Sequence, residues 1–280
     1  MDERPFQRIV LTGAAGRLAS VLRASLRELT HCLVLSDLVP PREALAANEI
    51  FMVCDLSDRQ AVSELLQGAE LVVHMGGISQ ERDFDAILQA NLVGQFNLYD
   101  NALTHGVKRI IQASSNHVTG YYRIDQPVSP QMPPRPDSLY AVSKCYGEAL
   151  ASFYHDRHGL ESVCLRIGSC SPRPRNLRAL NSWLSYADLC RLVRCAALAP
   201  QAGFAVVYGV SDNASTWWHG DDAKRIGYRP HDSSEPFRDA LAAAVSLPDP
   251  LYSIWQGGKM DARDYRKPET WNWPPPPISE

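Results

Sequence analysis

The sequence predicts an α/β fold built around a doubly wound parallel sheet, and two observations support this prediction. Short runs rich in Val, Ile and Leu alternate regularly with longer amphipathic stretches from residue 8 to residue 168. A glycine-rich turn, TGAAGRLA at 12–19, joins the first run to the first amphipathic stretch. Strands that alternate with helices in this way are typical of parallel sheets with right-handed crossovers. The length of 280 residues suits one large domain with a smaller addition.

Six runs in the first part of the chain have the length and apolar content of buried strands. The stretches between them repeat apolar residues every three to four positions, as one face of a helix does. In chain order the expected strands are RIVLTG (8–13), CLVLSD (32–37), IFMVCD (50–55), LVVHMGG (71–77), RIIQASS (109–115) and SVCLRIG (162–168). The expected helices cover 17–29, 59–68, 83–104 and 138–157.

The pattern loosens after residue 170, where SPRPRN reads as a turn-rich loop. Helices are expected over 185–198 and 235–246, and a further strand over 204–211. The last stretch, KPETWNWPPPPISE, holds too many prolines for a regular element and is expected to be an extended arm. We therefore divide the chain into a core over residues 1–170, a capping region interleaved with it over 171–260, and a Pro-rich tail over 261–280.

Composition excludes several classes of protein. The net charge is −3, and Lys and Arg form no extended cluster, so nucleic acid is not expected as a partner. Seven cysteines without a CxxC pair or His–Cys ligand spacing predict reduced thiols and no metal site. The charged start MDERPFQ is not a signal peptide, and no apolar run approaches the ~20 residues that cross a bilayer. These features favour a cytoplasmic protein with no membrane partner.

The turn at 12–19 has the spacing and context of a dinucleotide-binding loop in a Rossmann-type core. Gly13 permits a tight turn, and Gly16 lets backbone N–H groups approach a pyrophosphate at the helix N-terminus. The pyrophosphate would lie over Gly13, Ala15, Gly16, Arg17 and Leu18. The alternative is a pair of ordinary turn glycines, but the strand before them and the helix after them favour a cofactor site.

Acidic residues at the ends of the next two strands indicate which dinucleotide binds. Asp37 stands 24 residues after Gly13, where its carboxylate would accept the ribose hydroxyls. It would repel a 2′-phosphate, so NAD is favoured over NADP although Arg42 is near. Asp55 ends the third expected strand, on the adenine side.

A candidate catalytic pair lies on the expected helix 138–157. Tyr140 and Lys144 are four residues apart, so their side chains share one face. A free tyrosine titrates near ~10, and a cation beside it would favour the phenolate needed for a base at neutral pH. The spacing alone also occurs in surface pairs, but here the helix follows a strand that ends in Ser114-Ser115.

At these residues the sequence resembles the extended branch of the short-chain dehydrogenase/reductase superfamily. That resemblance implies that Ser115 holds the reacting hydroxyl, Tyr140 takes its proton, and Lys144 binds the nicotinamide ribose and lowers the tyrosine pKa. It also implies that Asn91 supports the cofactor site from its helix. The matching residues are TGAAGRLA, Asp37, Asp55-Leu56, the HMGG strand end, Asn91, Ser115, Tyr140 and Lys144.

A more specific resemblance is to bacterial uronate dehydrogenases. It extends over GGIS at 76–79, ASSNH followed by GYY, LYAVSKCYGE, RIGSC at 166–170, NLR at 176–178, WWHG and WQGG at 255–258. This resemblance implies NAD-dependent oxidation of the C1 hydroxyl of galacturonic or glucuronic acid to an aldarolactone. It does not settle which of the two acids is preferred.

A uronate needs several short polar side chains for its hydroxyls and one cation for its carboxylate. Asn116 and His117 would bind ring hydroxyls or the carboxylate, beside Ser115 and Tyr140. Ser79 and Ser169 follow strands at the carboxyl edge of the sheet, where ligands of such folds bind. Arg178 would pair with the substrate carboxylate. The plainer reading, that His117 and Arg178 are solvated loop residues, stays open at this stage.

Two other functions use the same fold. A nucleotide-sugar epimerase or dehydratase would place Val-Tyr-Gly three residues after the catalytic serine, where this chain has Val118-Thr119-Gly120. A non-catalytic NAD-sensing protein could lack the Tyr/Lys pair that this chain has. Related enzymes associate through helices corresponding to 83–104 and 138–157, so a homo-oligomer is expected.

Overall fold

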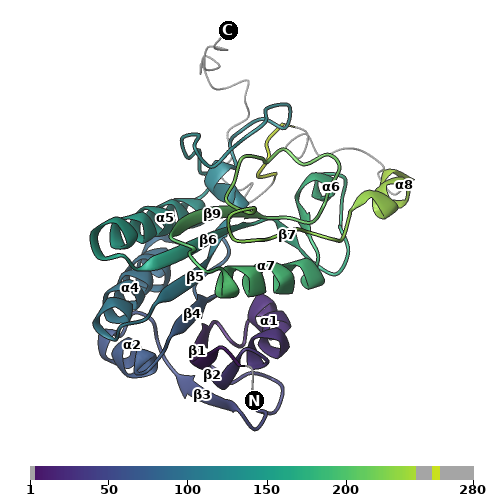
Figure 1. Ribbon diagram of the computed structural model, residues 1–280. Helices are drawn as coiled ribbons and strands as arrows, with labels where there is room; N and C mark the ends of the chain where they lie inside the picture. Colours follow the sequence, from purple (N-terminus) through teal and green to yellow (C-terminus); the bar gives the residue numbers. More distant parts are fainter. Residues whose placement is uncertain (1–3, 244–253, 259–280) are drawn as a thin grey trace.

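The computed structural model of the chain describes residues 4–243 and 254–258. Its centre is a seven-stranded sheet in the order β3-β2-β1-β4-β5-β6-β9 (Figure 1). Every pair of neighbouring strands in this sheet is parallel. Strand order reverses between β1 and β4, which makes the sheet doubly wound and confirms the predicted Rossmann-type α/β class.

All seven expected strands form, with boundaries shifted by a few residues. They are β1 (Phe6–Thr12), β2 (Thr30–Asp37), β3 (Glu49–Val53), β4 (Leu71–His74), β5 (Arg109–Ser115), β6 (Glu161–Ile167) and β9 (Phe204–Gly209). The main helices are α1 (Arg17–Arg27), α2 (Arg59–Leu66), α4 (Gly94–Thr104), α5 (Leu139–His158) and α7 (Tyr186–Leu198). Smaller elements are α3 (Phe84–Ile87), α6 (Ala179–Ser182), α8 (Arg238–Ala243) and a two-stranded ladder of β7 (Ser169–Cys170) and β8 (Trp183–Leu184).

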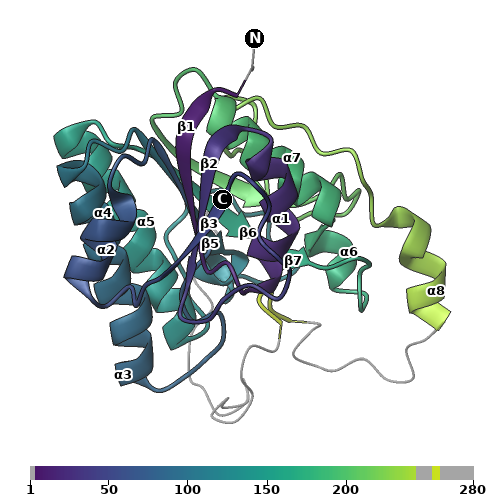
Figure 2. The same cartoon turned by 90° about the horizontal axis from the view of Figure 1, so that it is seen from below.

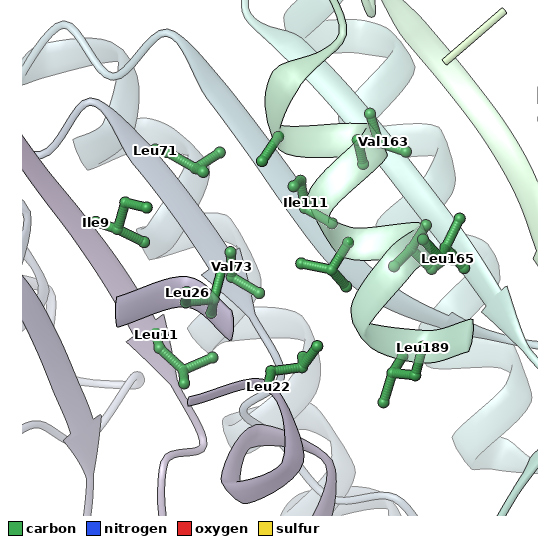
Figure 3. Close-up of a cluster of buried hydrophobic side chains, with 14 of the residues drawn as sticks. Ile9, Leu11, Leu22, Leu26, Leu71, Val73, Ile111, Val163, Leu165 and Leu189 are labelled. Atoms are coloured by element: carbon green, nitrogen blue, oxygen red, sulfur yellow. The ribbon is translucent and has the colours of Figure 1, made fainter. Parts of the chain in front are cut away.

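The sheet has a core on each face because side chains alternate along every strand. Ile9 and Leu11 point to the face covered by α1 and α7, and they share one cluster of buried side chains with Leu22 of α1 and Leu189 of α7 (Figure 3). Val10 between them points to the opposite core, which α2, α4 and α5 cover. The view from below places these helix groups on opposite sides of the sheet (Figure 2).

The expected helix 83–104 forms over residues 84–104, with one local change of helix type. It runs without a gap through α3, a π-helical turn at Leu88–Val93 and α4. Two close approaches accompany the π-helical turn: a Cβ on Gly94 would meet Leu56 Cβ at 2.8 Å, and Asn91 reaches back to bond the backbone of Ile78. The predicted helix is therefore confirmed, and the π-helical turn within it is a feature that its periodicity did not indicate.

The last third of the described chain adds the edge strand β9 to the sheet and a helix that packs on one face of it. Strand β9 pairs with β6, and α7 packs on the same face as α1. A separate cluster holds Tyr122, Val128, Tyr208 and Trp218, with the rings of Tyr208 and Trp218 stacked 5.1 Å apart. The expected helix 235–246 forms a 3₁₀ turn and α8 up to Ala243, and its end lies outside the described residues, as does the Pro-rich tail.

All seven cysteines are free thiols. In the part of the chain that the structure describes, no helix combines the length and hydropathy of a membrane span. The same residues contain no group of three His, Cys, Asp or Glu side chains placed to hold a metal ion.

Candidate active site

A cavity of about 690 Å³ opens along the carboxyl ends of β1, β2, β4, β5 and β6. We call one part the glycine end, which Gly13, Gly16, Arg17, Leu18, Asp37, Asp55 and Leu56 line. We call the other part the arginine end, which Ser79, Asn116, His117, Ser169, Arg175, Asn176 and Arg178 line. Ser115, Tyr140 and Lys144 also border this cavity. Most of the predicted site residues thus lie around one space, at the edge where such sheets bind ligands.

The glycine end is formed by closely packed backbone. Gly13 has φ +70°, and a Cβ there would lie 2.7 Å from backbone atoms of Met75 and Gly76. Gly16 is the N-cap of α1 and provides no side-chain cap, so the first N–H groups of the helix keep their bonding capacity at the cavity wall. This narrow, uncapped helix start fits a pyrophosphate.

Asp37 ties the end of β2 to the glycine turn. Its Oδ2 accepts from Ala15 N at 3.0 Å, and its Oδ1 accepts from Leu38 N at 2.7 Å. Each carboxylate oxygen retains a second lone pair, and Asp37 lines the cavity. Asp55 lies two residues beyond the end of β3 rather than at its last position, and its Oδ1 accepts from Ser57 N at 2.9 Å.

Ser115, Tyr140 and Lys144 meet between the two ends. Ser115 is the last residue of β5, and its hydroxyl hydrogen-bonds to Tyr140 near the start of α5. The ammonium of Lys144 lies 5.6 Å from the centre of the Tyr140 ring, one helical turn further on. Ser114 borders the cavity too, but its hydroxyl donates to Glu148 at 2.6 Å, which leaves Ser115 as the serine beside the tyrosine.

Burial is the largest cause of the pKa shifts of Tyr140 and Lys144. It raises the pKa of Tyr140, against the hydrogen bond from Ser115, and the carboxylate of Asp137 raises it further. Burial also lowers the pKa of Lys144 to about 8. The protein by itself therefore does not lower the tyrosine pKa in the way the family resemblance implied, because desolvation and the charge of Asp137 outweigh the hydrogen bond from Ser115.

Asn91 and Ala15 are not among the cavity's lining residues. The Asn91 side chain accepts from Ile78 N at 2.8 Å and donates to Ile78 O and to Ser143 Oγ, each at 2.9 Å. It joins the loop after β4 to α5 from behind the cavity wall. Ala15 acts through its backbone bond to Asp37. Both residues therefore brace the cavity wall instead of facing the interior.

Arg178 is held at the arginine end by groups from distant parts of the chain. Its Nε donates to Gln256 O at 2.7 Å, and its Nη1 lies 3.4 Å from Ser169 Oγ. With the Asn116 amide nitrogen donating to Ile167 O at 3.0 Å, the amide oxygen accepts from Arg178 Nη2 at 3.1 Å. Much of the Asn116 amide is thus used to orient the guanidinium.

His117 borders the cavity beside Tyr140, with the two ring centres 6.3 Å apart in an edge-on arrangement. Its Nδ1 bonds Asp137 Oδ2 at 2.7 Å, and its backbone N donates to Ser115 Oγ at 3.2 Å. Ser79 is an exposed residue of the loop after β4 and also lines the cavity.

Sequence reasoning missed several residues of this site. Arg175 and Asn176 line the cavity, although SPRPRN was read as a turn-rich loop. The side chain of Glu81 accepts from Leu139 N at 3.0 Å and Tyr140 N at 2.9 Å, so it fixes the start of α5. An acidic residue seven positions after a strand end gives no local signal for such a contact.

Gln256 is a further residue of the site that sequence reasoning missed. It is fully buried, and its carbonyl holds Arg178. Its side chain accepts from Trp218 Nε1 at 2.9 Å and donates to Arg123 O at 2.9 Å and Gln126 O at 2.6 Å. The sequence stretch WQGG carried only a family resemblance, without any indication of these bonds.

A model of the NAD dependent epimerase/dehydratase family matches residues 9–182, which contain the glycine turn, Ser115, Tyr140 and Lys144. The chain belongs to this family. Within it, a uronate dehydrogenase of Pseudomonas putida is 48% identical over 92% of this chain and 97% of its own length. This likeness places the chain among the uronate dehydrogenases of the family.

Solved structures of the same family agree with the fold. An Agrobacterium tumefaciens uronate dehydrogenase, as a tyrosine-to-alanine mutant complexed with NAD, has a TM-score of 0.87 and 42% identity, and the match covers 91% of this chain and 97% of that one. A glucuronic acid dehydrogenase from Chromohalobacter salexigens has a TM-score of 0.87 and 43% identity over 91% of this chain and 96% of that chain.

Proposed function

We propose that this member of the NAD dependent epimerase/dehydratase family oxidises the C1 hydroxyl of a hexuronic acid, D-galacturonate or D-glucuronate, to the aldarolactone. One observation carries the proposal: Arg178 lies in the same cavity as Ser115, Tyr140 and Lys144, held by Asn116 and Gln256. A fixed cation beside a hydroxyl-binding tyrosine suits a sugar that carries a carboxylate.

The glycine end fits NAD. Gly13, Gly16, Arg17 and Leu18 would hold its pyrophosphate at the start of α1, and Asp37 would accept the adenosine ribose hydroxyls. Lys144 would bind the nicotinamide ribose. When bound, NAD supplies the hydride acceptor and a positive ring that favours the phenolate form of a nearby tyrosine.

Tyr140 is the proposed base. Its phenolate removes the proton of the C1 hydroxyl, while Ser115 donates to the same oxygen and keeps it in place. The high pKa that burial gives Tyr140 makes the phenolate a strong base once a positive charge lies beside it. The Lys144 ammonium, 5.6 Å from the centre of the Tyr140 ring, supplies part of that positive charge.

Arg178 is the proposed partner of the substrate carboxylate, and His117, Ser79 and Ser169 are proposed contacts of the ring hydroxyls. Asn116 acts on the substrate mainly through Arg178, since its amide oxygen is taken by the guanidinium. A guanidinium oriented in advance loses less side-chain entropy on binding, which strengthens a charge-assisted hydrogen bond.

The experiment is NADH formation by the purified protein with galacturonate and glucuronate, with galactose and glucose as matched neutral sugars. Turnover of the acids with at least ~10-fold lower kcat/KM for the neutral sugars supports the proposal, because a carboxylate bound to a fixed arginine is worth about 1.5–3 kcal/mol. Equal turnover of acids and neutral sugars contradicts the role of Arg178. NAD binding without any sugar oxidation contradicts the proposed reaction.

We also propose a division into domains, a homo-oligomeric state and a cytoplasmic location. Residues 171–260 act as the substrate-capping region, since Arg178 and Gln256 come from it, and residues 1–170 act as the NAD-binding core.

A homo-oligomer is supported by exposed apolar side chains on α4 and α5: Phe96, Leu103, Leu139, Val142 and Phe153. Light scattering of the wild type and Phe153→Glu checks it. Seven free thiols support a cytoplasmic location.

A further inference from the structure

Asp137 lies directly behind the cavity wall, in the loop that leads into α5. Its side chain is only 4% exposed, and it is not among the lining residues of the cavity. Oδ2 bonds His117 Nδ1 at 2.7 Å, and Oδ1 accepts from Ser138 Oγ at 3.1 Å. Ser138 in turn caps α5 by accepting from Ala141 N. Both carboxylate oxygens are therefore fixed by donors from the chain.

Two glycines close over this carboxylate. A Cβ on Gly120 would lie 2.0 Å from Asp137 Oδ2, and one on Gly257 would lie 1.9 Å from it. The two glycines are themselves joined, since Gly257 N donates to Gly120 O at 2.9 Å. Three segments that are far apart in the sequence thus leave room for one carboxylate in one position. This arrangement holds the carboxylate against His117 and prevents it from turning away.

The contact decides which ring nitrogen of His117 carries a proton. A carboxylate buried in this way is an acceptor, so the neutral imidazole keeps its hydrogen on Nδ1. Nε2 then carries the lone pair. The Nδ1 edge of the ring faces Asp137 behind the wall, whereas the His117 side chain borders the cavity beside Tyr140. Nε2 is the nitrogen left to act as an acceptor for a ligand.

We propose that Asp137 is a positioning residue for substrate binding: it fixes the tautomer and the ring orientation of His117 so that Nε2 accepts a hydrogen bond from a ring hydroxyl of the uronate. The inference rests on the proposed function and adds a residue to it. It gives the arginine end one acceptor of fixed orientation, next to the donors of Arg178 and Ser115. A sugar hydroxyl, which can donate, is complementary to that acceptor.

A purely structural Asp137 would stabilise the loop without acting through His117. A double-mutant cycle separates the two roles. In Asp137→Asn the carboxamide has nearly the same shape but can donate to Nδ1, which permits the other tautomer. We expect KM for the uronate to rise about 10-fold or more, with KM for NAD unchanged. His117→Ala should give a similar rise, and the double variant should be no worse than His117→Ala alone.

Asp125→Asn is the matched control, because Asp125 is an exposed acid of the same long loop, paired with Arg123. Additive effects of Asp137→Asn and His117→Ala would overturn the inference, as would an unchanged uronate KM in Asp137→Asn. Failure of the wild type to oxidise uronates would overturn the proposed function together with this inference. An active wild type with additive variants would overturn the inference alone.

A measurement on the wild type tests the inference independently of how Asp137→Asn folds. The ¹⁵N chemical shifts of the His117 ring, assigned with His117→Gln, report the protonated nitrogen directly. We expect hydrogen on Nδ1 and none on Nε2 at neutral pH. Hydrogen on Nε2, in either the other tautomer or the imidazolium, would contradict the acceptor role.

Discussion

At the glycine end of the cavity the turn and the helix start lie within one short segment, braced by Asp37 from the end of β2, whereas at the arginine end Arg178 is held by groups from distant segments. Gly13 and Gly16 lie three residues apart. Arg178, by contrast, depends on Asn116 and Gln256, which lie far from it in the sequence. The difference teaches that the proposed pyrophosphate site is encoded largely by one local motif, while the proposed carboxylate site depends on tertiary structure.

Removing the base where the two ends meet should have the largest effect. Tyr140→Phe keeps the ring on α5 but loses the proton acceptor, so kcat should fall about 10²- to 10⁴-fold while NAD affinity stays within a factor of two or so. Steady-state NADH formation and calorimetric titration with NAD check the two halves of this prediction. Tyr146→Phe, a half-buried tyrosine of the same helix, is the control. Substantial residual kcat in Tyr140→Phe would remove Tyr140 as the base.

Gly13→Ala tests the local character of the glycine end. A Cβ at φ +70° would be strained and would also contact the backbone of Met75 and Gly76 at 2.7 Å. We expect about 2–4 kcal/mol lower free energy of unfolding and a large loss of NAD affinity. Gly106→Ala is matched in backbone conformation, at φ +69°, but has no atom within 4 Å of its Cβ, so it should lose stability without losing NAD affinity. Equal NAD affinity in both variants would contradict the prediction.

Arg178→Ala tests the arginine end. It should lower kcat/KM for galacturonate and glucuronate by about 10- to 100-fold, since a charge-assisted hydrogen bond is lost, and leave KM for NAD unchanged. Arg173→Ala changes an exposed arginine of the same loop that does not line the cavity, and should have little effect. A rise in KM for NAD in Arg178→Ala would show that the two ends are not separable.

The smallest expected effect concerns pH. His74 ends β4 next to the glycine turn, with its Nδ1 2.8 Å from Thr12 Oγ1. Burial, together with the smaller effect of the Lys144 charge, lowers its pKa from 6.5 to about 3. Between these values the unfolded chain binds a proton that the folded chain does not. The free energy of unfolding should therefore fall by up to ~1.4 kcal/mol per pH unit below about 6.

Urea denaturation of the wild type and His74→Gln at pH 7, 6 and 5 measures this contribution. The variant should show a shallower loss of stability on acidification, and His158→Gln, an exposed histidine of α5, should behave as the wild type does. Identical slopes in all three proteins would mean that His74 does not carry the acid sensitivity.

The strands of the sheet and the main helices could be predicted from the sequence, because each strand is a short apolar run and each main helix has its own periodicity. The sequence was also sufficient to group Gly13, Asp37, Ser115, Tyr140 and Lys144 around one cavity, since short motifs and strand ends determine where these residues lie. The helix 83–104 was predicted, but the π-helical turn within it was not, because that turn contacts Leu56 and Ile78 from other parts of the chain.

Asp137 and Gln256 were not predictable for the same reason. Asp137 stands in the Pro-rich stretch PPRPDS, where an acidic residue is ordinary, and only the folded chain brings it to His117. Gln256 is a single amide whose partners Trp218, Arg123 and Gln126 become neighbours through tertiary packing. Neither residue belongs to a local pattern of spacing or periodicity.

Gln256 follows every strand that the structure describes, and this order matters while the protein is being made. A chain leaving the ribosome presents its N-terminal elements first, so the sheet and the glycine turn can form before the residue that orients Arg178 has been translated. The residues of the proposed NAD site therefore all precede the residue that orients Arg178. The proposed carboxylate site is completed last, when synthesis has passed residue 256.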